Sequence, residues 1–461
     1  MLARSLLAVA LVPAFAYANT PEDVYGASGR TIAMGGAGTA LPGDYSAAHY
    51  NPANLSQCFD DQVDLDVSYI AHRMTFSDQN TASPLVPKSP RDQTRLMLGS
   101  CIALPLDISA GILLGFGTPG AIGLDQQTAN PTPDYVMYGD AHEQLSAAVG
   151  LSWKATPRLS IGLGFAALVK SQLPIGASFP ILEPDPNDPS GYQPVAFTLG
   201  LGMGAMLAPR AGVLWMPSPH FRVGAAYRGA LYHDLDVDAT IDAKLIVDIP
   251  VPVHVDSLGW FSPRQFSAGA SGEPTPDVTL TADVTYYRWG ELKDKLSSYP
   301  FLNMYSLDPN GASGALVFPH PIRPGWKNNV AWRAGGEWRV RDRTMAIRGG
   351  LGYRTSAVNN PDDSNVNLLD APTITASAGV AWLANGEAVA PGTPRKPPGP
   401  RHHWWRYDVP DVHFRADAFV RVDHMLEQTV DHTSTDPAIP DKHFTFGGDI
   451  VQIGAMATLG W

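Results

Sequence analysis

The chain has 461 residues, a formal net charge of −12 and only 16% charged residues, with two cysteines but 44 glycines and 41 prolines. This negative charge argues against a nucleic-acid partner, because nucleic acid is bound mainly through cationic side chains. After the first eighteen residues there is no apolar run of about 18 residues, which excludes a transmembrane helix in the rest of the sequence.

Residues 1–18, MLARSLLAVALVPAFAYA, have the three parts of a secretory signal peptide. Arg4 precedes an apolar run from Leu6 to Phe15, and Ala16-Tyr17-Ala18 is a small-x-small cleavage site. The sequence therefore predicts export and cleavage before Asn19. A short N-terminal membrane anchor is the alternative.

What recurs along the rest of the chain is alternation of apolar and polar residues, the period of a β-strand with two different faces. Residues 160–169, 279–287 and 345–354 alternate in this way. Charged groups in one row would carry a large desolvation cost in a dry sandwich core. They can line a wet lumen while the apolar row faces lipid. In residues 413–424 the two rows are Phe414, Ala416, Ala418, Val420 and Val422 against Arg415, Asp417, Arg421 and Asp423.

The connections between the alternating segments are short and long in turn. Short links lie near 105–107, 154–157, 216–219, 273–277 and 340–343, and long links near 77–91, 118–140, 171–200, 292–324, 356–370 and 427–442. Short turns on one side and long loops on the other are typical of bacterial outer-membrane barrels. We predict an all-β protein, a transmembrane antiparallel β-barrel of about 14 strands. A soluble all-β sandwich is the alternative.

The chain ends on a strand-like stretch, IVQIGAMATLGW, whose last residue is Trp461. A final strand must pair with the first strand to close a barrel, and a terminal aromatic residue suits the interfacial girdle. The stretch resembles the C-terminal signal of bacterial outer-membrane proteins, which the barrel-assembly machinery recognises. Trp461 is therefore the predicted assembly signal.

Residues 25–58 precede the first strand and are rich in glycine and alanine, with little alternation. Here the sequence resembles the FadL/TodX family of outer-membrane channels for hydrophobic compounds. The residues that carry the resemblance are Gly29, Gly35, Gly36, Ala37, Gly38, Asp44, Ser46, Ala47 and the run from Tyr50 to Ser56. The Asn-Pro-Ala signature within that run is the most family-specific part.

The resemblance implies a hatch of residues 19–60 inside a barrel of residues 61–461. It implies passive uptake of hydrophobic compounds through an apolar pocket, without a cofactor, metal or enzymatic activity. Long-chain fatty acids are the first expectation, and aromatic or alkane hydrocarbons taken by the same route are the alternative. A barrel hydrolase and a general diffusion porin are further alternatives. A porin is disfavoured because a plug-like segment would obstruct its lumen.

The family releases its substrates sideways, through a gap made by a kink in the third strand. In this chain Gly115, Gly117, Pro119 and Gly120 lie along the expected third strand, and glycine and proline weaken ladder pairing. Ordinary barrel glycines followed by a loop turn are the alternative. Residues Asn51, Pro52 and Ala53 are expected to brace this kink.

A fatty acid would need a cationic partner for its carboxylate. Lys170, Lys293 and Lys295 follow two of the predicted strands and are the candidates. The resemblance does not align them with the family's ligand-binding positions. The alternative is that they are rim lysines in contact with water or lipopolysaccharide.

Two further predictions concern covalent and peripheral features. Cys58 and Cys101 lie near the periplasmic ends of the first two strands, so antiparallel pairing in an oxidising compartment favours a disulfide between them. Two free buried thiols are the alternative. The Pro-rich insert 385–410 is basic, carries Trp404 and Trp405, and is placed on the periplasmic side by strand parity, against the inner leaflet or a partner. A disordered loop is equally compatible. The protein is expected to be a monomer surrounded by outer-membrane lipid and lipopolysaccharide.

Overall fold

A computed structural model of the chain describes the following residues: 17–18, 20–58, 61–79, 87, 89–117, 133–138, 145–169, 173–185, 188–201, 206–244, 248–292, 325–340, 343–359, 367–384, 413–433 and 442–461. In 17–18, 169, 173–185, 188–201, 233–244 and 248–260 the backbone alone is described. Most of the predicted signal peptide and the insert 385–410 lie outside these residues.

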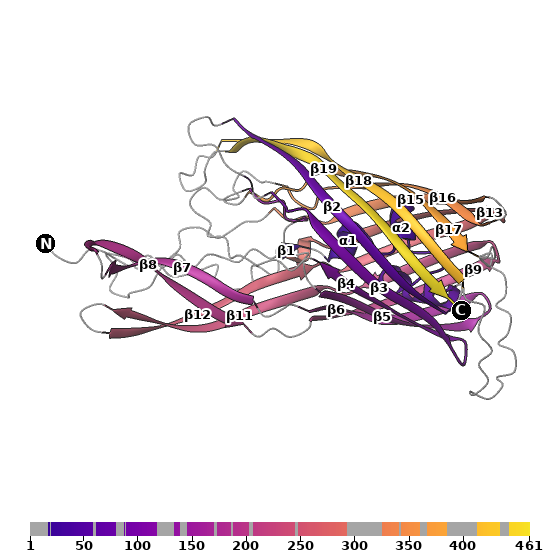
Figure 1. The fold of residues 1–461 in the computed structure, drawn as a ribbon, viewed down its shortest axis with the longest axis horizontal. Helices are drawn as coiled ribbons and strands as arrows, with labels where there is room; N and C mark the ends of the chain where they lie inside the picture. The colour runs from indigo at the N-terminus through magenta and orange to yellow at the C-terminus, as the bar shows by residue number, and fades with distance from the viewer. Residues whose placement is uncertain are drawn as a thin grey trace.

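Fourteen antiparallel strands form a closed barrel, as the sequence predicted (Figure 1). The strands are β2 (Gln62–Asp78), β3 (Gln93–Leu104), β4 (Ile108–Gly117), β5 (Leu145–Thr156), β6 (Leu159–Val169), β9 (Met206–Ser218), β10 (Phe221–Arg228), β13 (Gln265–Thr275), β14 (Val278–Tyr287), β15 (Asn329–Val340), β16 (Met345–Arg354), β17 (Thr373–Ala384), β18 (His413–His432) and β19 (Lys442–Gly460). The last strand closes the barrel against the first, in register from Phe444↔Asp78 to Gly460↔Gln62.

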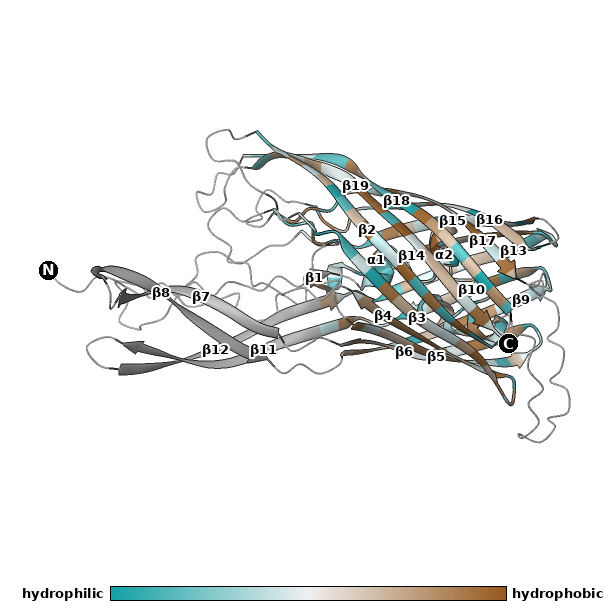
Figure 2. Ribbon diagram, viewed as in Figure 1, coloured by the Kyte–Doolittle hydropathy of each residue, from teal (hydrophilic) through white to brown (hydrophobic). Residues whose placement is uncertain are grey.

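Two-residue periodicity decides which side chains face lipid and which face the lumen. On β18, Phe414 and Val420 are exposed on the outer face, whereas Asp417 and Asp423 are buried on the inner face. Figure 2 shows hydrophobic residues recurring along the barrel strands, with hydrophilic residues at the far ends of β2 and β19. The rows predicted for 413–424 are therefore confirmed.

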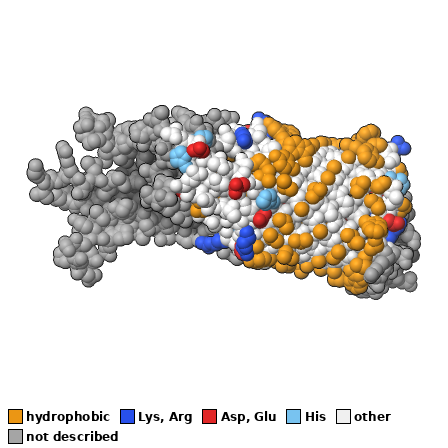
Figure 3. Space-filling view, turned by 90° about the horizontal axis from the view of Figure 1, so that it is seen from above, with side chains coloured by type: hydrophobic (Ala, Val, Ile, Leu, Met, Phe, Trp, Pro, Cys, Tyr) orange, Lys and Arg blue, Asp and Glu red, His pale blue; other side chains and the backbone are white. Residues whose placement is uncertain are grey.

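The apolar outer face forms a belt, and charged residues mark its boundary toward the C-terminal end of β2. On β2 the outward apolar row runs from Val63 to Ala71 and is followed by exposed Arg73. Arg73 lies beside Asp449 of β19, which lies beside His424 of β18, so the boundary continues across three strands. About eight residue steps of ~3.4 Å, tilted by roughly 40°, give ~21 Å of apolar height, close to the ~25 Å band of outer-membrane barrels. Figure 3 shows this belt with charged side chains along one edge.

The two ends of the barrel differ, and we name them the turn end and the loop end. Short turns join β3 to β4, β5 to β6, β9 to β10, β13 to β14 and β15 to β16, and the C-terminus lies at this turn end. Two hairpins lie beyond the barrel at the loop end, which is the external end of such barrels. They are β7–β8 (Leu173–Asp185, Asp188–Leu201) and β11–β12 (Leu231–Lys244, Asp248–Ser262), and β1 (Tyr17–Ala18) pairs with β12.

Residues 20–58 lie inside the barrel and are called the inner segment. They contain α1 (Pro21–Tyr25), α2 (Gly29–Ala33), α3 (Ala47–Tyr50) and the 3-10 helix η1 (Pro52–Gln57), and nearly all of residues 20–55 are buried. Among the described residues no helix has the length and apolar character needed to cross a membrane.

Candidate functional site

The inner segment is seated on inward-facing glycines of the barrel wall. A Cβ on any of these glycines would meet an atom of the inner segment, so the two backbones approach closely only because side chains are missing there. Gly111↔Gly150, Gly162↔Gly212 and Gly335↔Gly350 are cross-strand neighbours. We call the set the glycine ring: Gly99, Gly111, Gly150, Gly162, Gly212, Gly224, Gly269, Gly335, Gly350 and Gly379.

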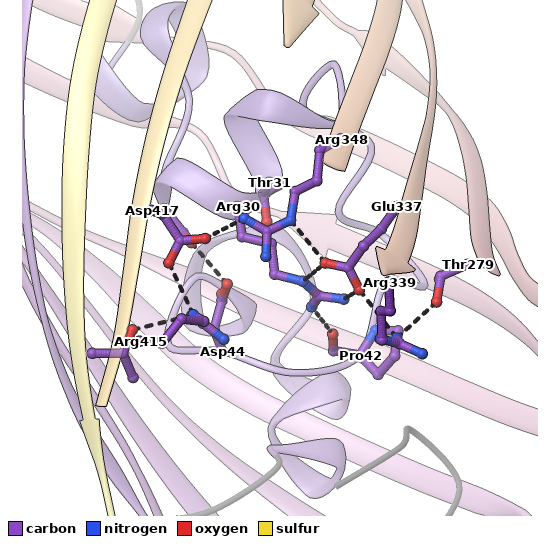
Figure 4. Close-up of polar contacts among 12 residues, drawn as sticks. Arg30, Thr31, Pro42, Asp44, Thr279, Glu337, Arg339, Arg348, Arg415 and Asp417 are labelled. Carbon is purple, nitrogen blue, oxygen red and sulfur yellow. Dashed lines mark hydrogen bonds and ion pairs between the residues drawn. The ribbon is translucent and has the colours of Figure 1, made fainter. Parts of the chain in front are cut away.

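Ion pairs tie the inner segment to the wall (Figure 4). Arg30 of α2 donates two hydrogen bonds to Glu337 of β15, at 2.9 and 3.2 Å, and a third to the carbonyl of Pro42 at 2.5 Å. Glu337 also accepts from Arg339 at 3.0 Å and from Arg348 at 2.8 Å. All four charged side chains are at least nine-tenths buried, so the single carboxylate of Glu337 offsets the burial of three guanidinium groups. The network continues from Arg348 to Asp417 and Arg415.

A second polar cluster surrounds Asp23 of α1. Asp23 pairs with Arg228 and accepts from Gln265 at 2.9 Å, while Arg228 contacts His49 Nε2 at 2.8 Å. Burial together with the charges of Arg228 and Arg210 lowers the pKa of His49 to about 3. Burial opposes ionisation of Asp23, but the adjacent Arg228 holds its pKa well below the usual value. Asp23 is therefore ionised and His49 neutral near pH 7.

The Asn-Pro-Ala signature is hydrogen-bonded within the inner segment and to β9, and its expected bracing of the kink stays a prediction. Asn51 Nδ2 donates to the carbonyls of Thr39, at 2.8 Å, and of Val213 on β9, at 3.2 Å. Asn51 Oδ1 accepts from the Ala53 amide at 3.1 Å and caps η1, which packs mainly on β5, β6 and β9. The signature thus holds two parts of the inner segment together. The third strand is instead approached by Leu55, beside Gly111.

The third barrel strand is β4, as expected. It is paired with β3 as far as Gly117 but with β5 only as far as Gly115. Gly115 faces Glu22 of α1, which accepts from Ser146 of β5 at 2.5 Å and from Arg95 at 3.1 Å. Pro119 and Gly120 lie outside the described residues, so the kink stays a prediction.

A disulfide joins Cys58, at the end of the inner segment, to Cys101 of β3. It lies near the turn end of the barrel, where the inner segment leads into β2. The inner segment is thus covalently fixed to the wall at its C-terminal end, while ion pairs and close packing hold the rest.

A cavity of about 50 Å³ lies between α1 and the wall formed by β14 to β18. Val24 of α1, Met137 and Trp289 give it an apolar side. This side continues into a buried aromatic cluster in which Trp289 stacks on Trp326 with centroids 4.8 Å apart and lies 6.0 Å from Phe261.

The lining of the cavity also carries charged residues. They are Arg333, Arg354 and Arg421 together with Asp23 and Asp423. These three arginine side chains are 13–18% exposed, in contrast to 1% for Arg30. A lining that combines aromatic and cationic side chains suits an amphipathic guest.

A second, outer pocket of about 370 Å³ lies at the loop end. The carboxylate of Asp370 lines it and accepts from Arg354, which lines the inner cavity, at 2.7 and 2.9 Å. The Arg354–Asp370 ion pair therefore links the linings of the two spaces. The other lining residues include Lys327, Asn359, Gln428, His432 and Phe446.

Lys170, Lys293 and Lys295, the predicted headgroup residues, lie outside the described residues. The cations that the structure brings to the cavity are arginines. Arg354 and Arg421 stood in alternating rows of the sequence, whereas Arg333 was not singled out. Trp289 stood within the stretch YYRWGEL that drew attention to the lysines. Alternation shows that a side chain faces inward. Its height along the barrel axis, and therefore its neighbours on other strands, depends on the strand register.

Comparisons with known proteins agree with this architecture. The family model described as "Outer membrane protein transport protein (OMPP1/FadL/TodX)" matches residues 9–390. A FadL homologue from Pseudomonas aeruginosa superimposes with a TM-score of 0.54 at 14% identity, covering 93% of this chain and 97% of that one. The toluene transporter TodX of P. putida gives 0.52 at 15% identity, covering 95% and 99%. No curated protein matches the chain significantly by sequence.

The structural likenesses are below 25% identity and establish the fold, while the family model covers most of the chain. Together with the closed barrel and its apolar belt, they place the protein in the bacterial outer membrane. This chain belongs to the OMPP1/FadL/TodX family of outer membrane transport proteins.

Proposed function

We propose that the protein takes up long-chain fatty acids passively across the outer membrane, with no chemical change to the substrate. The observation that carries the proposal is the cavity between α1 and the wall, whose lining is both apolar and cationic. Trp289 and Met137 are offered to a hydrocarbon chain, and the guanidinium groups are offered to a carboxylate. The outer pocket supplies a route of entry from the loop end.

The carboxylate is assigned to the arginines at the cavity rather than to the predicted lysines. Arg333 is the preferred candidate because its pairing is the loosest: 3.5 Å to Asp283, with neutral bonds to Tyr287 and Thr285. Arg354 is held by two short bonds to Asp370. A carboxylate can therefore pair with Arg333 without breaking a tight ion pair.

Release is proposed to be sideways, next to Gly115. Below the cavity the lumen is occupied by the inner segment and its buried charges, which makes a straight path costly for an apolar molecule. Displacement of α1 would withdraw Glu22 from Ser146 and open space beside the end of the β4–β5 ladder. The inner segment would then act as a hatch.

Uptake of a labelled long-chain fatty acid and of a neutral aromatic compound tests the headgroup assignment. Arg333→Gln should lower uptake of the acid several-fold and leave the neutral compound unchanged. Arg73→Gln, an arginine on the outer face, is the matched control and should change neither. Equal loss of both compounds in Arg333→Gln, at equal surface expression, would contradict the assignment.

Two variants test the hatch. Asn51→Ala should reduce uptake of both compounds, because it loosens the inner segment's fold. A disulfide between cysteines introduced by Glu22→Cys and Ser146→Cys should fix α1 to β5 and stop uptake, although the ligand still binds. Reduction of this disulfide should free α1 and restore uptake. Wild-type protein treated with the same reductant is the control. Full uptake through the cross-linked protein would rule out movement of α1.

Neutral aromatic hydrocarbons are the second candidate substrates. The stacked Trp289–Trp326 pair and Phe261 favour them, since aromatic rings pack well on aromatic walls. Uptake of the neutral aromatic alone in wild-type cells would select this alternative.

A further inference from the structure

Trp289 carries an unused hydrogen-bond donor at the cavity. It directly follows the loop end of β14, is fully buried, and lines the cavity next to Tyr287. Its ring is fixed by stacking on Trp326 and by contact with Phe261. Within the described part of the chain its indole N–H has no hydrogen-bond partner. A buried Trp N–H usually has a partner, so this donor is available to a guest.

Asn329 carries an unused acceptor at the same cavity. It begins β15 opposite Tyr287, is 2% exposed, and its Nδ2 donates to the Thr355 carbonyl at 2.8 Å. That bond fixes the orientation of the amide, because the flipped form would set two oxygens against each other. The other polar atom of the amide is therefore the oxygen Oδ1, which is an acceptor. Within the described residues no donor is hydrogen-bonded to it.

We propose that the cavity recognises a hydroxyl group on its hydrophobic substrate, with Trp289 donating to that oxygen and Asn329 Oδ1 accepting from its proton. A hydroxyl supplies one acceptor and one donor at a single atom, which is the combination that these two side chains leave open. The inference rests on the proposed uptake function and makes it narrower: the favoured substrates are hydroxylated hydrophobic compounds.

The alternatives satisfy the pair less well. A hydrocarbon would leave both groups without partners after displacing water, which a cavity of about 50 Å³ has room to hold. An ionised carboxylate could accept from Trp289 but would set its negative charge against Asn329 Oδ1. Its place is beside the arginines of the lining. A hydroxylated fatty acid or a phenol can use the Trp289–Asn329 pair as well as the apolar wall.

Equilibrium binding of 4-ethylphenol and ethylbenzene to the purified full-length protein in detergent tests the proposal. The two probes share a skeleton and differ by one hydroxyl group. Wild-type protein should bind 4-ethylphenol more tightly, by about tenfold for each hydrogen bond gained. Trp289→Phe keeps an aromatic ring and removes the N–H, so it should weaken the binding of 4-ethylphenol about tenfold more than the binding of ethylbenzene. Asn329→Leu should reduce the preference in the same way.

Trp326→Phe is the matched control, because Trp326 belongs to the same stack but does not line the cavity. It should leave the ratio of the two affinities at the wild-type value. Equal affinities for both probes in wild-type protein, or an unchanged ratio in Trp289→Phe, would overturn the hydroxyl assignment while ethylbenzene binding keeps the uptake proposal intact. Failure of both probes and of a long-chain fatty acid to bind would instead overturn the proposed uptake function itself.

Discussion

Replacing Glu337 with Gln should release the inner segment from the barrel wall. The substitution keeps the shape of the side chain and removes the negative charge that Arg30, Arg339 and Arg348 share. Arg348 retains Asp417 as a partner, and Arg30 loses both bonds to the Glu337 carboxylate. Removing one partner of a buried ion pair costs about 3–5 kcal/mol. Because one of the three arginines stays paired, we expect the lower end, about 3 kcal/mol.

Amide hydrogen exchange of the detergent-solubilised protein measures this loss locally. A cost of about 3 kcal/mol corresponds to roughly 100-fold faster exchange in peptides from residues 20–58, with the barrel strands unchanged. Glu273→Gln is the matched control: Glu273 is equally buried and bonds Arg222 at 2.8 Å, both on barrel strands. Unchanged exchange in Glu337→Gln, or the same acceleration in Glu273→Gln, would refute the claim that Glu337 anchors the inner segment.

Three further predictions concern acid, the disulfide and the C-terminus. The folded-state pKa of His49 is about 3, below its ordinary value of 6.5, so the stability that neutral His49 gives to the inner segment is complete above pH 6.5 and declines as pH falls towards 3. At pH 5, amide exchange in residues 20–58 should be about 30-fold faster than above pH 6.5, after correction for intrinsic rates. The lowered pKa of Asp23 adds a further loss of stability below that group's ordinary value of 3.8. Thiol labelling of unreduced, denatured protein should detect neither Cys58 nor Cys101, and replacing both with Ser should cost about 4 kcal/mol for a sequence separation of 43, seen as earlier unfolding in urea. Changing the exposed Trp461 to Asp should lower the amount of heat-modifiable barrel far more than a change in a loop-end residue would, and normal levels would argue against a role in assembly.

The barrel was predictable because the sequence patterns that specify it, alternation and link length, are local. Alternation on β18 fixes the lipid-facing Phe414 and the inward Asp417 from sequence alone, and short links mark the turn end. The hairpin β11–β12 was not predicted, because its second strand contains Pro250 and Pro252 and proline is disfavoured within β-strands. A strand outside the barrel tolerates such residues more easily than a wall strand does.

The site was less predictable for a different reason. Arg354 and Arg421 were recognised as inward-facing, but they meet at one cavity only through the register of β16, β17 and β18. Asn51 was singled out from the sequence for its expected role as a brace, yet its partner on the wall, Val213, lies 162 residues away in the chain. Pairwise contacts at such separations are set by strand order and stagger, which a single sequence does not state.

The glycine ring has a consequence for the order of events during folding. Because the described wall closely approaches the inner segment on many strands at once, threading that segment into a finished barrel would require these contacts to open. The segment is made before every wall strand, and the pairing of β19 with β2 completes the enclosure. We therefore expect the N-terminal residues to be in place when β19 pairs with β2. The wall strands would then set their register around the inner segment.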